Sequence, residues 1–173
     1  GDVIIGIEET PVAGMDDTDV YLSAPSGQPV FRSGSDVRFL SGTPLTLSGD
    51  LSVAGSGKLT FSAPVKVTGS GSISARTIAF SSVVDGPGAL TLDCTGGSVT
   101  FGAPAGALSK LSSVTVAGAG DVTITDGLRA DGFIQLAGTG TTSLGDGSLL
   151  LGSGGANITA HRLEGRIVAG SLA

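Results

Sequence analysis

The chain has few of the side chains that usually fill a globular core. Tryptophan is absent from its 173 residues, tyrosine occurs once, and aromatic residues make up only 4%. Charged residues are also scarce, at 14%, whereas 40% of the residues are hydrophobic. Disordered chains have the opposite balance, with much charge and few apolar residues. The chain is therefore expected to fold, around a thin core that is filled without aromatic side chains.

Cysteine and histidine occur once each, as Cys94 and His161. A lone cysteine excludes an internal disulfide and a zinc site built from thiolates, and a lone histidine excludes a multi-histidine metal site. Cys94 continues the alternation of Leu90 and Leu92, which predicts a buried, inert thiol. His161 is expected on the surface.

Charge of one sign is concentrated at the start of the sequence, because residues 1–20 hold six acidic side chains and no lysine or arginine. The nine basic residues are spread thinly, so the basic stripe of a nucleic-acid-binding protein is missing and nucleic acid is not an expected partner. Without an apolar run of about 18 residues, membrane insertion by this segment is not expected. Asp16, Asp17 and Asp19 form a weak candidate site for calcium, a cation that prefers oxygen ligands; a solvated acidic loop is the favoured alternative.

From residue 45 onward, short segments alternate apolar and polar residues and are separated by Gly, Pro, Asp and Ser. This period of two predicts strands with one buried face. The predicted inward pairs are Leu45/Leu47, Leu51/Val53, Leu59/Phe61, Val65/Val67, Ile73/Ala75, Ile78/Phe80, Leu90/Leu92, Val99/Phe101, Val114/Val116, Val122/Ile124, Ile134/Leu136 and Leu149/Leu151.

A motif with two glycines separated by one residue recurs, as in VTGSGS at Val67, VAGAGD at Val116 and LAGTGT at Leu136. A second echo relates FSAPV at Phe61 to FGAPA at Phe101. Such repeats predict an all-β chain, a right-handed single-stranded parallel β-helix (β-solenoid) whose rungs stack on their neighbours. About 16 residues per rung give about eight rungs over residues 41–173, and the less regular, acidic residues 1–40 form a cap or an inter-subunit segment.

Residues 78–125 resemble the repeats of large bacterial surface proteins of the filamentous haemagglutinin and autotransporter passenger type. The resemblance lies in the strings VDGPGALTL, SVTFGAPAG and LSSVTVAG, which are followed by a glycine and a further strand. It implies a right-handed β-helix that is exported to the cell surface or the extracellular space, with a stalk or adhesive role and no catalytic residues. The secretion domain and the translocator barrel of such proteins have no counterpart here.

The favoured function is a structural or adhesive module, with copies of itself, adjoining rungs and surface glycans as partners, and with self-assembly end to end into filaments. Two alternatives remain open. A cytoskeletal β-helix polymer is suggested by LSGDLSVAG and ITAHRLEGRIVAGSL. A carbohydrate-active β-helix enzyme would need clustered carboxylates on one face of the rod; its candidates are Asp85, Asp93, Asp126 and Asp131, with Arg76 and Arg129. Enzyme activity is not expected.

Outward threonines suggest one more function, because flat threonine arrays on some β-helices bind ice. The candidates are Thr46, Thr60, Thr68, Thr91, Thr100, Thr115, Thr123 and Thr125. The repeat steps between them are irregular, and threonine is favoured on any exposed strand. The sequence therefore predicts that these residues do not share one flat register.

Overall fold

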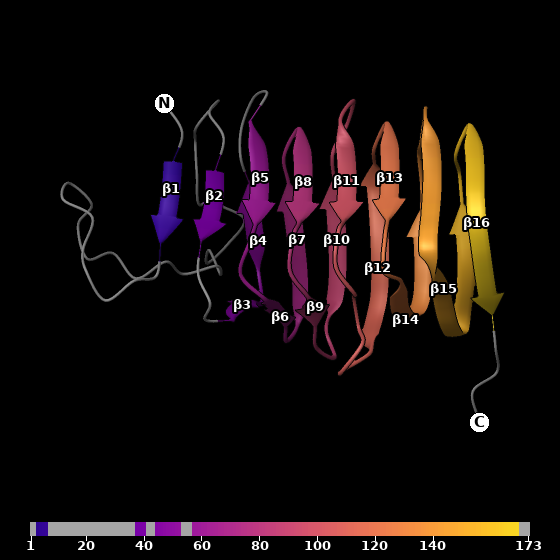
Figure 1. Cartoon of the computed structure of the whole chain (residues 1–173), viewed down its shortest axis with the longest axis horizontal. Helices are drawn as coiled ribbons and strands as arrows, with labels where there is room; N and C mark the ends of the chain where they lie inside the picture. The colour runs from indigo at the N-terminus through magenta and orange to yellow at the C-terminus, as the bar shows by residue number, and fades with distance from the viewer. Residues whose placement is uncertain (1–2, 7–36, 41–43, 53–56, 170–173) are drawn as a thin grey trace.

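The computed structural model describes residues 3–6, 37–40, 44–52 and 57–169, and these residues form a parallel β-solenoid without a helix (Figure 1). All the pairings between its strands are parallel. The polypeptide winds through about six turns, and the strands of successive turns stack into three faces. The fold class predicted from the repeats is confirmed.

Face 1 carries the longest ladder of strands. Its strands in stacking order are β1 (Val3–Gly6), β2 (Val37–Leu40), β5 (Lys58–Phe61), β8 (Thr77–Phe80), β11 (Ser98–Phe101), β13 (Asp121–Ile124) and the first parts of β15 (Thr141–Ile158) and β16 (Arg162–Ala169). The strands β1 and β2 belong to residues 1–40, and both extend this ladder.

Faces 2 and 3 complete each turn. Face 2 holds β3 (Leu45–Leu47), β6 (Val65–Val67) and β9 (Val84–Asp85), and it continues through Ala105 to Leu128. Face 3 holds β4 (Asp50–Ser52), β7 (Ser70–Ser74), β10 (Ala89–Asp93), β12 (Leu111–Gly118) and the second half of β14 (Leu128–Gln135). The long strand β15 passes through all three faces and pairs with β13, β14 and β16.

Each turn uses more of the chain than the repeats predicted. On face 1, Leu59 pairs with Ile78 and Val99 pairs with Val122, so that one turn takes roughly 20 residues. The predicted rung is therefore too short, and the predicted count of eight rungs is too high. The reason is that the two-glycine motifs sit at two different corners: Val67 precedes the corner between faces 2 and 3, whereas Val116 lies at the corner between faces 3 and 1.

Glycine is required where the chain turns closest to the rung below. At the corner between faces 3 and 1, a Cβ added to Gly97 would lie 1.5 Å from the carbonyl oxygen of Arg76. At the corner between faces 2 and 3, Gly86 has φ +125°, a conformation that L side chains rarely adopt. Sharp corners keep the three faces close together, so the space between them is narrow.

Phenylalanine fills the middle of that space. The low aromatic content had suggested a core without aromatics, but Phe61, Phe80 and Phe101 were also predicted to face inward, and they do. Phe39, Phe61, Phe80 and Phe101 occupy one register position on face 1 and are stacked, with ring centroids 5.0, 4.9 and 4.9 Å apart. All four are at most 1% exposed. Few aromatic residues are therefore enough, because the parallel register brings four of them into one stack. The echo between FSAPV and FGAPA marks this column, two turns apart.

The predicted inward residues are buried wherever their side chains are described, except for the pair Ile134/Leu136. In the second half of β14 the inward residues are Phe133 and Gln135, whereas Ile134 faces outward and Leu136, just after the strand, is 59% exposed. The prediction of Ile134 and Leu136 as inward was wrong by one residue, a slip that moves every side chain to the opposite face. Phe133 is paired with Val114, and both side chains are fully buried in the core.

The observed register of β14 places Gln135 inside the solenoid, where it forms a polar pair with Thr142. Gln135 and Thr142 are 1% and 0% exposed, and the Thr142 hydroxyl donates a 2.7 Å hydrogen bond to Oε1 of Gln135. Among the described residues, the amide nitrogen of Gln135 has no partner. Buried polar groups are stable only when hydrogen bonds replace those lost to water. The last turns are therefore held by a mixed core in place of a purely apolar one.

Candidate functional site

The outward side of face 1 carries two aligned columns of small, mostly hydroxylated side chains. The strand pairings place one column through Thr77, Ser98 and Asp121, and the other through Thr60, Ala79, Thr100, Thr123 and Ser143. The first column continues to Thr141, whose amide donates a 2.8 Å hydrogen bond to the carboxylate of Asp121. We call these residues the hydroxylated face. It runs along β5, β8, β11, β13 and β15, which lie side by side in Figure 1.

Two spacings set the geometry of the hydroxylated face. Neighbouring strands lie about 4.8 Å apart, and alternate residues of one strand lie about 6.8 Å apart. As predicted, the eight threonines do not share one flat register, because Thr46 lies on face 2 and Thr91 and Thr115 lie on face 3. The prediction was wrong only for subsets such as Thr60, Thr100 and Thr123, which share one column on face 1. Differences in turn length are absorbed at the corners, so the strand register survives them.

Face 3 carries a shorter column of the same kind. Ser72, Thr91 and Thr115 are paired in register on the outside of β7, β10 and β12. The next residue of that column is Ile134, so the run of hydroxyls stops there. Face 3 is therefore the less regular of the two polar surfaces.

Three of the six residues considered for an enzyme meet at one loop, residues 106–110. One oxygen of Asp85 accepts hydrogen bonds from the amides of Leu108 and Ser109, at 3.0 and 3.2 Å. Arg129 donates to the carbonyl oxygen of Ala107 at 3.4 Å. Lys110 forms an ion pair with Asp131. These side chains hold the loop through its backbone and Lys110, while the second carboxylate oxygen of Asp85 is buried without a hydrogen-bond partner among the described residues.

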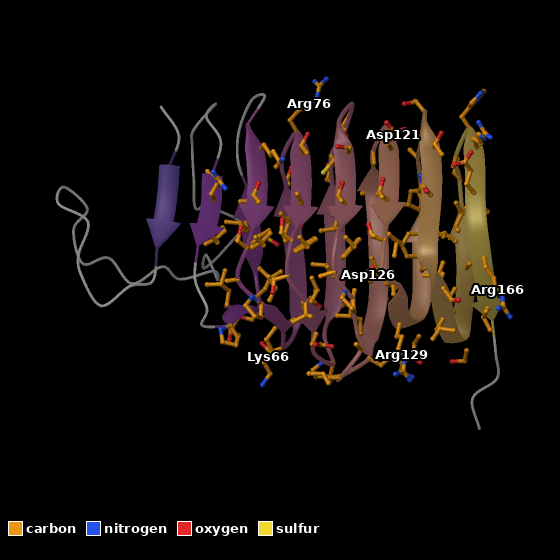
Figure 2. All side chains as sticks on the ribbon, in the orientation of Figure 1. Lys66, Arg76, Asp121, Asp126, Arg129 and Arg166 are labelled. Atoms are coloured by element: carbon orange, nitrogen blue, oxygen red, sulfur yellow. The ribbon has the colours of Figure 1, made fainter. Side chains whose placement is uncertain are left out.

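The other three residues lie elsewhere. Asp93 accepts from the amide and the hydroxyl of Thr95, at 3.2 and 2.8 Å. Figure 2 shows Arg76 and Arg129 at opposite long edges of the solenoid, with Asp126 between them. The six residues considered for catalysis therefore do not form one constellation, and no group of three metal-ligating side chains occurs in the part of the chain that the structure describes.

The remaining predicted residues divide into buried, exposed and undescribed. Cys94 is fully buried, as predicted, and burial raises the pKa of its thiol to about 12. His161 is exposed, also as predicted. The candidate calcium ligands Asp16, Asp17 and Asp19 lie outside the described residues. Sequence reasoning missed the Gln135–Thr142 pair, for which the only signal was a glutamine close to Phe133 in an alternating segment.

Comparison with protein-family models, with curated proteins and with solved structures finds no match to this chain. In the described residues there is also no long apolar helix of the kind that crosses a membrane. What is established is thus the fold, a parallel β-solenoid, and the surfaces that it presents.

Proposed function

We propose that this chain is a structural and adhesive module of an exported bacterial surface protein, a rod that presents the hydroxylated face to polysaccharides. The observation that carries the proposal is the alignment of hydroxyl side chains along five consecutive strands of face 1. Parallel ladders and a continuous buried core hold these side chains in place. Contact with an extended polymer then costs little conformational entropy on the protein side.

The chemistry of the hydroxylated face suits glycans. A serine or threonine hydroxyl both donates and accepts hydrogen bonds, as sugar hydroxyls do. Single contacts of this kind are weak, but a repeating surface can make many of them to a repeating polymer. This additive mode of binding is what an adhesive module uses, and it needs no catalytic residue.

The resemblance to filamentous haemagglutinin and autotransporter repeats supports the same proposal. Residues 78–125 run from β8 to the end of β13 and cover two successive turns of the solenoid. The resembling region therefore spans about two complete turns, and each of the three strings is a part of a turn. Export to the cell surface or the extracellular space belongs to this proposal.

The proposal is tested by retention on insoluble cellulose, chitin and peptidoglycan. The double variant Thr100→Ala/Thr123→Ala removes two hydroxyls from the centre of the hydroxylated face. The matched control is Thr91→Ala/Thr115→Ala on face 3. We expect the wild type and the control to be retained on at least one polymer, and the face 1 variant to be retained several-fold less. Absence of retention of the wild type, or equal loss in both variants, would contradict the proposal.

A second function is favoured by the same register, namely binding of ice. Ice binding requires a rigid, flat array of hydroxyls. The alignment of Thr60, Thr100 and Thr123 in one column provides part of such an array. Inhibition of ice recrystallisation by the wild type, abolished by a bulky Thr100→Tyr substitution, would establish ice binding. The charges of Lys58 and Asp121 interrupt the array, which is why we rank glycans first.

The two rival classes make different predictions. A cytoskeletal polymer would appear as long filaments in negative-stain electron microscopy of the purified chain across a concentration series, with or without calcium. A carbohydrate-active enzyme would release soluble sugar from the retained polymers. Retention without release, together with short particles, supports the adhesive module against both.

A further inference from the structure

A third column of exposed residues lies beside the hydroxylated face. Each of its members follows the last inward residue of a face 1 strand and donates its amide to the carbonyl oxygen of a phenylalanine in the preceding turn. They are Ser62, Ser81, Gly102 and Thr125, and all four are exposed. Neighbouring columns are about 6.8 Å apart and neighbouring strands about 4.8 Å apart, so an extended polymer can lie along the rod and contact more than one column.

The central part of this surface holds one charge. On β8, β11, β13 and β15, Asp121 is the only charged side chain among the described residues of the three columns. The other positions hold serine, threonine, alanine or glycine. Asp121 is exposed, and its carboxylate accepts a 2.8 Å hydrogen bond from the amide of Thr141. The negative charge therefore has a defined position between hydroxyl side chains.

Other charges on face 1 do not cancel that of Asp121. Lys58 is in the same column but three strands away, or about 14 Å, whereas charges in water are screened over about 8 Å at physiological ionic strength. Arg162 is next to Thr141 in the column and forms an ion pair with Glu164. Figure 2 shows Arg76 projecting beyond the edge of the solenoid, apart from Asp121. The middle of the hydroxylated face is therefore locally negative.

From this arrangement we infer that Asp121 sets the specificity of the hydroxylated face, which binds polysaccharides with free amino groups in preference to their neutral N-acetylated forms. A protonated amino group donates a charge-assisted hydrogen bond to the carboxylate. The hydroxyls of Ser98 and Thr123, on either side of Asp121, bind the hydroxyls of the same sugar. N-acetylation removes the positive charge, and an acidic sugar would bring two negative charges together. The inference rests on the proposed function and names the class of glycan that it takes.

The expected preference is modest, because the carboxylate is exposed to water. One exposed ion pair changes an affinity by about two- to fivefold. Salt screens the attraction between charges, so the preference is expected to disappear at about 1 M salt. Hydrogen bonds between uncharged hydroxyls are not screened in this way, and retention through them is expected to remain.

The test compares retention on chitin with retention on chitosan, its deacetylated form, and on insoluble polygalacturonate. At about pH 5.5 the carboxylate is ionised and the amino groups of chitosan are protonated. The wild type is expected to prefer chitosan to chitin, and to be retained least on polygalacturonate. Asp121→Asn keeps an oxygen that can accept from the Thr141 amide but removes the charge. It is expected to lower the ratio of chitosan to chitin retention by about two- to fivefold and to leave retention on chitin unchanged.

Two further variants separate this inference from the effect of net charge. The chain has a formal net charge of -6, which attracts any polycation. Asp50→Asn makes the same charge change at an exposed position on β4 of face 3, and is expected to leave the ratio near that of the wild type. Asp121→Asn/Ser98→Asp moves the carboxylate by one strand within its column and is expected to restore the preference. Far-UV circular dichroism checks the fold of each variant.

Several results would overturn the inference. They are a wild type that is retained equally on chitosan and chitin, an equal fall of the ratio in Asp121→Asn and Asp50→Asn, or a preference that survives at about 1 M salt. Any of these, with retention on chitin intact, would leave the proposed function standing. Absence of retention of the wild type on every neutral and charged polymer would instead refute the proposed function, and the inference with it.

Discussion

The stack of phenylalanine rings makes a graded prediction about stability. Phe80 is in contact with two rings, Phe61 and Phe101, each with its centroid 4.9 Å away. Phe101 has Phe80 on one side, and on the other side its register partner is Ile124. Replacing either ring by leucine keeps an apolar side chain of similar size but removes two stacked pairs at position 80 and one at position 101.

The expected cost follows from the number of lost pairs. A stacked aromatic pair contributes about 0.5–1.5 kcal/mol beyond the burial of its area. Phe80→Leu is therefore expected to lower the free energy of unfolding by roughly 1–3 kcal/mol, and Phe101→Leu by about half as much. Phe80→Ala also leaves a cavity where the ring was 1% exposed, and is expected to cost about 3–5 kcal/mol.

Urea unfolding followed by far-UV circular dichroism measures these differences. With a slope of about 2 kcal/mol per molar urea, a loss of ~2 kcal/mol moves the midpoint by roughly 1 M. The order expected is Phe80→Ala, then Phe80→Leu, then Phe101→Leu, with the first the least stable. A Phe80→Leu midpoint equal to or above that of Phe101→Leu would refute the argument that ring stacking along the column stabilises the solenoid.

Three further predictions concern a corner, the buried polar pair and the thiol. Gly97→Ala is expected to destabilise the fold by about 3 kcal/mol or more, because its added Cβ would collide with a backbone oxygen. Gly69→Ala is the control: a Cβ there has nothing within 4 Å, so its thermal melt is expected to stay near that of the wild type. Thr142→Val is expected to lower the free energy of unfolding by about 1–3 kcal/mol, because it leaves the Gln135 oxygen unpaired. The double variant Thr142→Val/Gln135→Leu is expected to recover most of that loss. If the losses of the two single variants simply add in the double variant, the two side chains are not coupled. The Cys94 thiol is expected to resist a disulfide reagent at pH 8 until urea unfolds the chain. Because the folded state raises its pKa to about 12, the stability that Cys94 contributes is present below pH 9 and lost as the pH rises toward 12, a decline that Cys94→Ala should not share.

Much of the fold could be predicted because β-solenoids are built from local signals. The alternation of apolar and polar residues indicates which side of each strand is buried, and the glycines mark the corners. Leu59, Ile78 and Val99 were predicted to face inward, and all three are fully buried in one column. Where two adjacent residues could both be apolar, as at Phe133 and Ile134, alternation alone did not choose between them, and packing against Val114 did.

The number of turns and the surface columns could not be obtained in the same way. Both depend on register, which is set by hydrogen bonds between residues about 20 positions apart. The repeats of the glycine motif mix two corners, so their spacing misled the estimate of turn length. The alignment of Thr60, Thr100 and Thr123 also depends on register, so it could be seen only in the stacked strands of the structure.

The sequence by itself determined that this chain is an all-β solenoid with a thin buried core, a buried thiol and a surface rich in hydroxyls, since composition and a period of two act within each strand. Only the tertiary structure decided which residues become neighbours across turns. Stacking brings four phenylalanines into one column and aligns the hydroxylated face. Contacts across turns arise from the pairing of distant strands, and for this reason a residue-by-residue pattern does not contain them.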